Sequence, residues 1–170
     1  MKKISFIVWI FLLWIFQTVF SDFIKIGGIG PQLLYVFVVC MAMKEKKPMY
    51  YITVGIVCGL LSDVVSGGVQ GYYLIMYTCT VIGVVALGEL IYKESFFAVV
   101  PVTLIFSFIL NSGYYFVNRG HLQGIEYLNA LKSIIIPTVL YNSLIAILIN
   151  FILNKSIYKK MALRNRGKRS

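Results

Sequence analysis

Residues 55–71 read GIVCGLLSDVVSGGVQG, an apolar run that contains a single acidic residue, Asp63. Within this stretch, Gly55, Gly59, Asp63, Gly67 and Gly71 recur at every fourth position. Residues four apart share one face of a helix, with a drift of about 40° per step. We therefore expect Gly55, Gly59 and Asp63 on one narrow stripe, where the glycines admit a neighbouring helix beside the carboxylate.

The composition of the whole chain is that of a membrane protein. It has 170 residues, of which 59% are hydrophobic and only 13% are charged. Soluble domains are about half apolar and about a quarter charged. The apolar runs are continuous rather than alternating, which favours helices over a β-barrel. The sequence predicts an all-α membrane protein with about six transmembrane helices in one compact bundle.

The expected spans follow the apolar runs between short polar connections, and they cover residues 4–20, 29–43, 49–66, 72–91, 96–117 and 130–153. They form one domain over residues 1–154, followed by a basic tail over residues 155–170. Pro31 suits the first turn of the second helix. That helix barely spans a bilayer, so we expect either a thin bilayer or an irregular outer end. Pro137 is expected to kink the sixth helix, because it removes a backbone hydrogen bond.

The positions of the basic residues predict the orientation in the membrane. The net charge is +10 and comes from the connections and the tail, which points to a membrane rather than to nucleic acid. With the N-terminus inside, all but three of the 16 Lys and Arg residues lie on the inner side, the exceptions being Lys25, Arg119 and Lys132. Both termini are therefore expected in the cytoplasm. We interpret the tail as a positive-inside anchor, which could also bind anionic lipid or a cytoplasmic partner.

The sequence contains no hydrolase elbow, phosphate-binding loop or metal-binding cluster. Its acidic residues are dispersed, and Asp63 and Glu89 are expected at opposite leaflets, too far apart to pair. An intramembrane protease would need two mid-depth aspartates, and a lipid phosphotransferase would need clustered acids for a metal. We therefore expect no catalytic site, no cofactor and no bound metal.

Two interpretations of Asp63 remain open. It lies three residues before Ser66, where the helix is expected to end, so it could simply meet water at the outer surface. Alternatively, it is buried and bonded to a partner helix or loop, with Arg119 or Asn142 as candidates. A carboxylate near a helix C-terminus opposes the macrodipole and requires compensation, which favours the second interpretation.

Three short motifs resemble one known family, that of the bacterial rod shape-determining membrane protein MreD. They are Gly30-Pro31-Gln32-Leu33-Leu34, Gly59-Leu60-Leu61-Ser62-Asp63 followed by Gly67 and Gly71, and the pair Pro137 and Asn142. The size and six-span layout are also similar. The candidates for helix packing or interaction are Gly55, Gly59, Asp63, Gly67, Gly71, Pro31, Pro137 and Asn142. The outer loop, residues 118–129, carries no motif of this kind.

The resemblance implies a non-catalytic component of the machinery for lateral cell-wall growth, located in the bacterial cytoplasmic membrane. The implied partners are an MreC-like single-span protein and, more distantly, an MreB-like filament and RodA-like and penicillin-binding synthases. The expected fold is also similar to the substrate-binding subunits of energy-coupling-factor vitamin transporters, so a small-molecule uptake subunit is the alternative. Those subunits dock their coupling protein through small residues on the first helix, often Ala-x-x-x-Ala. Here that helix reads ISFIVWIFLLWIFQTVF, without Ala or Gly, which disfavours the alternative.

Overall fold

A computed structural model describes residues 3–19, 23, 25, 28–44, 48–87, 98–118 and 126–166. The regular elements of these ranges are helices: α1 (Lys3–Val19), α3 (Leu33–Ala42), α4 (Pro48–Ser66), α5 (Tyr72–Leu87), α6 (Val99–Val117), α7 (Tyr127–Ala130), the π-helix η2 (Leu131–Ile135) and α8 (Ile136–Arg166). The expectation of an all-helical protein is confirmed. In a bilayer this follows from the backbone, because a helix satisfies its own N–H and C=O groups where water cannot.

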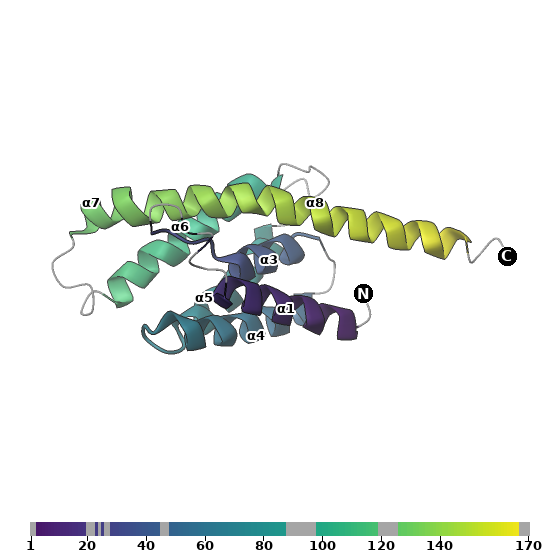
Figure 1. Cartoon of the computed structure of the whole chain (residues 1–170), viewed down its shortest axis with the longest axis horizontal. Coiled ribbons are helices and arrows are strands. Elements are labelled where there is room, and N and C mark those ends of the chain that lie inside the picture. Colours follow the sequence, from purple (N-terminus) through teal and green to yellow (C-terminus); the bar gives the residue numbers. More distant parts are fainter. Residues whose placement is uncertain are drawn as a thin grey trace.

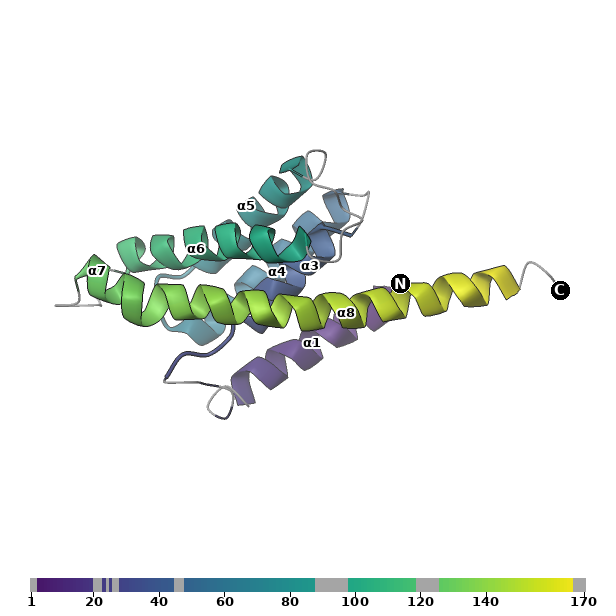
Figure 2. The same ribbon diagram turned by 90° about the horizontal axis from the view of Figure 1, so that it is seen from above.

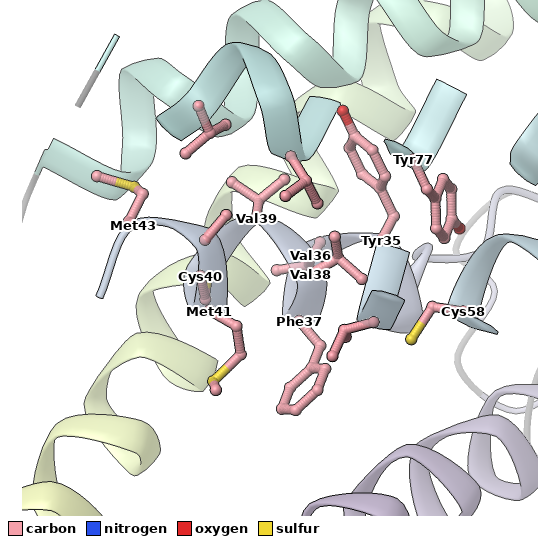
Figure 3. Packing of buried hydrophobic residues seen from close by; sticks show 14 of the residues in the cluster. Tyr35, Val36, Phe37, Val38, Val39, Cys40, Met41, Met43, Cys58 and Tyr77 are labelled. Carbon is pink, nitrogen blue, oxygen red and sulfur yellow. The ribbon is translucent and has the colours of Figure 1, made fainter. Parts of the chain in front are cut away.

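The short helix α3 lies at the centre of the bundle (Figure 1). All ten of its residues are buried. Figure 3 shows side chains of α3 pointing outward in several directions: Tyr35 lies next to Tyr77 of α5, whereas Phe37 points to another side of the helix. The rings of Tyr35 and Tyr77 are 5.1 Å apart between centroids. A helix that is apolar on all sides and buried all round is the expected core element.

The other helices form two pairs around α3. Helix α4 packs mainly against α5, and α6 packs mainly against α8, whereas α3 contacts all four of these helices. Helix α1 packs on α3 and α4, and in Figure 2 it lies apart from the α6–α8 pair over much of its length. The central helix therefore connects two helix pairs that make few direct contacts with each other.

The second expected span is shorter in the structure than in the sequence-based expectation. Residues 29–43 were expected to be helical, but α3 begins only at Leu33, and residues 29–32 are irregular. At 1.5 Å per residue, α3 is about 15 Å long, roughly half the thickness of the hydrocarbon core. The N-terminal end of this span is irregular, as one of the two alternatives predicted. Pro31 lies two residues before the helix rather than in its first turn.

The last helix is longer than expected. Instead of residues 130–153, the helical stretch runs without a break from Tyr127 to Arg166, so most of the basic tail continues α8. Figure 1 shows this C-terminal part extending past the rest of the bundle. The kink expected at Pro137 stays a prediction: a π-helical turn, η2, ends two residues before the proline, and α8 continues through it. Residues 88–91, 96, 97 and 20, which were included in expected spans, lie outside the described residues.

Two stretches are long and apolar enough to cross a membrane by length and composition, Val99–Val117 and Tyr127–Lys155. Many large apolar side chains are exposed on the outside of α1, α4, α6 and α8. On α8 they recur at a helical spacing that forms one outward stripe: Ile136, Leu140, Leu144, Leu148 and Ile152. Such a surface suits hydrocarbon rather than water.

Candidate functional site

Gly55 and Gly59 form the contact between α4 and α5. A Cβ atom at Gly59 would lie 2.5 Å from the Cα of Leu74 and 2.8 Å from the carbonyl oxygen of Tyr73. At Gly55 it would lie 3.1 Å from a Val81 methyl and 3.3 Å from a backbone oxygen. The two backbones thus approach most closely at Gly59. Because lipid tails are as apolar as leucine, such close packing supplies much of the attraction between helices in a bilayer.

Asp63 lies one turn beyond Gly59 and caps the start of α5. Its side chain is only 2% exposed. One carboxylate oxygen accepts the backbone N–H of Tyr73 at 2.9 Å, and the other accepts that of Leu74 at 3.0 Å. These amides belong to the first turn of α5, whose N–H groups have no partner within their own helix. Asp63 thus acts as an N-cap supplied by the preceding helix, and the positive end of the α5 dipole stabilises its charge.

This geometry decides between the interpretations of Asp63. The carboxylate is buried and bonded rather than exposed to water. Its partner is not Asn142, as considered from the sequence, since the Asn142 side chain bonds Gln32 and Ser107 instead. Arg119, the other candidate, lies outside the described residues. The negative charge of Asp63 at the C-terminal end of α4 is compensated by two backbone N–H groups of α5. A sequence does not reveal such a partner, because every residue except proline has a backbone N–H.

Gly67 and Gly71 shape the turn between α4 and α5 instead of packing against a helix. Their φ angles are +63° and +87°, in the left-handed region that favours glycine. Between them, Gly68 faces α6, where an added Cβ would lie 2.7 Å from the Tyr114 hydroxyl. The next residue, Val69, donates its N–H to the Asn118 side-chain oxygen at 3.0 Å. The turn is therefore held against the end of α6.

A second polar cluster surrounds Gln32 at the start of α3. The side-chain oxygen of Asn142 on α8 accepts the Gln32 backbone N–H at 2.9 Å, and its amide donates to the Gln32 side-chain oxygen at 3.1 Å. The Gln32 amide donates in turn to Asn111 on α6 at 3.0 Å. Ser107 completes the cluster, accepting from Asn142 at 2.8 Å. Both Asn142 and Ser107 are fully buried.

The cluster explains why α3 begins after Pro31. Gln32 occupies the cap position, where its backbone N–H is bound by Asn142 and its carbonyl accepts the first helical bond, from Val36, at 3.0 Å. Gln17 of α1 accepts the N–H of Leu34 at 3.0 Å. Pro31 is buried just outside this cap. Side chains of three other helices thus contact the N-terminal end of α3, as Asp63 does at the N-terminal end of α5.

The opposite end of α3 is also tied to α8. The ammonium of Lys44 donates to the backbone oxygen of Asn150 at 3.3 Å and to the side-chain oxygen of Asn154. Burial lowers the pKa of Lys44. Along the same contact, the Cys40 thiol donates to the carbonyl of Ala146 at 3.6 Å. Helix α3 is therefore bound to α8 near both of its ends.

Sequence reasoning missed Gln17, Gln32 and Ser107 as hydrogen-bond partners, and it did not place Asn111 in the cluster. The available signal was weak: each is an uncharged polar residue within or beside an apolar run. Pro137 contacts neither cluster through a hydrogen bond in the part of the chain that is described, but it follows the π-helical turn that precedes Asn142. Such turns and prolines change the direction of a helix.

The chemistry of both clusters is that of helix association. No group of three or more His, Cys, Asp or Glu side chains able to hold a metal occurs within the described ranges. In the same ranges, every buried side-chain nitrogen and oxygen has a hydrogen-bond partner. The polar groups of the interior are thus occupied with one another or with helix ends.

Comparison with known proteins places the chain. The family model described as rod shape-determining protein MreD matches residues 1–160. The chain belongs to the MreD family. The suspected family is thereby confirmed, and MreD is a membrane family of rod shape determination. No curated protein and no solved structure matches the chain. The expected likeness to vitamin-transporter subunits stays a prediction.

Proposed function

We propose that this MreD protein is a non-catalytic component of the cell-elongation machinery in the bacterial cytoplasmic membrane and acts through protein–protein contacts. The family match carries the proposal. It is supported by the interior, where the buried polar side chains bind helix ends and each other. Hydrogen bonds of this kind hold the helices in one arrangement, which suits a scaffold.

The proposed direct partner is an MreC-like single-span protein. An MreB-like filament and RodA-like and penicillin-binding synthases are the more distant partners that we propose. We further propose that both termini are cytoplasmic and that the basic end of α8 binds anionic lipid, at about 1 kcal/mol per basic residue near the surface. The excess of Lys and Arg on one side supports this orientation.

Depletion and complementation in the host test the function. Loss of the protein should produce rounded cells, and the wild-type gene should restore rods. Purification from native membranes should retain the MreC-like protein and should not retain an ATPase subunit of a vitamin transporter. Rod-shaped growth after complete depletion, or stable recovery with a transporter ATPase, would contradict the proposal.

A further inference from the structure

The C-terminal end of α3 meets α8 at the place where the apolar stretches of both helices end. Helix α3 ends at Ala42, and the apolar stretch of α8 ends at Lys155. Lys44, two residues after α3, donates hydrogen bonds to Asn150 and Asn154 of α8. An apolar span ends where the hydrocarbon core ends, and the polar headgroups form the next layer of the bilayer. The ammonium of Lys44 therefore lies at the level of the lipid headgroups.

Lys44 carries a positive charge that no acidic side chain in the described ranges neutralises. Its side chain is half-buried, and both of its acceptors, the Asn150 carbonyl and the Asn154 side-chain oxygen, are uncharged. Burial lowers the pKa of Lys44, because part of the hydration of its charge is lost. An ammonium has three N–H donors, so one of them is left for a further partner. A negatively charged acceptor would offset the cost of this burial.

Two further donor groups lie beside Lys44. Because an ammonium only donates, Asn154 turns its side-chain oxygen to Lys44, and its own amide N–H groups are left for other partners. These N–H groups bind no described residue, and they are accessible, since every buried side-chain nitrogen of the described residues has a partner. The next residue, Lys155, is exposed and pairs with no residue of the described chain. Donors without an accompanying negative charge are the composition of an anion site.

We infer that Lys44, Asn154 and Lys155 bind the phosphate of an anionic phospholipid at this end of the α3–α8 contact. Phosphate oxygens accept several charge-assisted hydrogen bonds, and basic pockets between membrane helices bind lipid headgroups. The position at headgroup level favours a lipid over a soluble phosphate. Phe151 and Ile152, which precede the site on α8, are 58% and 52% exposed and offer apolar surface to the acyl chains. The inference rests on the proposed function for the cytoplasmic side, and it adds a defined site to the lipid binding proposed for the basic tail.

Lipid binding by purified variants tests the site. Dioleoyl-phosphatidylglycerol is titrated into the full-length protein in mild detergent, and the lipid bound per chain is measured by native mass spectrometry. Lys44→Gln keeps a donor for α8 but removes the charge, so the affinity should fall about tenfold, the loss expected for one charged hydrogen bond. Lys44→Arg keeps the charge and should bind like the wild type. Lys132→Gln makes the same change of charge on η2, at the opposite end of the bundle, and is the matched control that should have no effect.

Two competing ligands identify the source of the phosphate. The zwitterionic dioleoyl-phosphatidylcholine should bind about tenfold more weakly than the anionic lipid, because its choline opposes the positive site. Inorganic phosphate should not displace the anionic lipid, since it gains nothing from the apolar surface of α8. Displacement by inorganic phosphate, or equal binding of the two lipids, would overturn the assignment to an anionic phospholipid.

A second variant separates the site from the fold. Lys155→Gln changes an exposed side chain, so it should leave the unfolding temperature unchanged and weaken lipid binding about threefold. It decides the question if Lys44→Gln does not fold. Wild-type affinity of the Lys44 and Lys155 variants, or an equal loss in Lys132→Gln, would overturn the site. Depletion and complementation test the proposed function separately, so it stands if the lipid site fails.

Discussion

The carboxylate of Asp63 and the backbone N–H of Tyr73 are joined by a 2.9 Å hydrogen bond that links the end of α4 to the start of α5. The contact solves two problems at once. An acidic group near a helix C-terminus is destabilised by its own dipole, and the first amides of a helix have no internal partner. Placing the carboxylate beside the amides satisfies both groups.

Two substitutions of Asp63 distinguish the contribution of its charge to stability from that of its hydrogen bonds. Asp63→Asn keeps one acceptor oxygen, so one of the two bonds can survive, and we expect a loss of about 1–2 kcal/mol in unfolding free energy. Asp63→Leu leaves two amides without a partner in apolar surroundings and should cost about 3 kcal/mol. Thermal unfolding of purified protein measures both changes. Val64→Ala, at a neighbouring side chain that is 72% exposed, is the control. Unchanged unfolding of Asp63→Leu would refute the capping role.

The glycines of α4 should differ in their tolerance of a methyl group. At Gly59 the added Cβ meets backbone atoms of α5, which cannot rotate away, so Gly59→Ala should cost about 1–3 kcal/mol. Gly55→Ala should cost less, since a movable Val81 methyl is its nearest neighbour. Gly67→Ala has free space but a positive φ, and should cost about 1 kcal/mol. Equal stability of the Gly59 and Gly55 variants would argue against the close contact.

The cluster around Gln32 should behave as a unit. Asn142→Ala removes the acceptor for the Gln32 N–H and two donated bonds, so we expect a loss of about 2–4 kcal/mol. In a double-mutant cycle, Asn142→Ala and Gln32→Ala should couple by about 1 kcal/mol. Asn142→Ala and Thr18→Ala serve as the control pair, because Thr18 is exposed on α1 and bonds only within its own helix. Additive losses for the first pair would mean that the two residues act separately.

The orientation can be read from reporter fusions. Fusions after Lys47, Lys93 and Ser170 should report the cytoplasm, and fusions after Gly68 and Gly124 should report the outside. The physical reason is the accumulation of Lys and Arg on one side. An outside signal at Ser170 would exclude an even number of spans.

Shortening the tail tests its role as an anchor. Removal of residues 164–170 should leave membrane insertion intact, because Lys155, Lys159 and Lys160 remain in the shortened chain. Membrane abundance and cell shape are measured together. Loss of rod shape at normal abundance would show that a cytoplasmic partner, rather than lipid, depends on these residues.

The amino-acid sequence was sufficient for the helical class and the membrane location. It also placed the starts of α1, α4 and α5 to within one residue. Long apolar runs must form helices in lipid, and the turns that separate them are polar or glycine-rich. The stripe of Gly55, Gly59 and Asp63 could be placed on one face of α4 for the same reason, since the spacing of residues on a helix is constant.

Only the tertiary structure showed which groups contact these helix faces and helix ends. Asp63 binds backbone amides of α5, and Gln32 is bound by side chains from α6 and α8 that are 79 and 110 residues away in the chain. Helix α3 starts late because Asn142 and Gln17 cap it, and α8 continues into the tail. Backbone N–H groups do not distinguish one position of the sequence from another. Single Asn and Gln residues do not recur at a helical spacing as apolar residues do. Their pairing therefore depends on how the helices are arranged in space, which local sequence patterns do not encode.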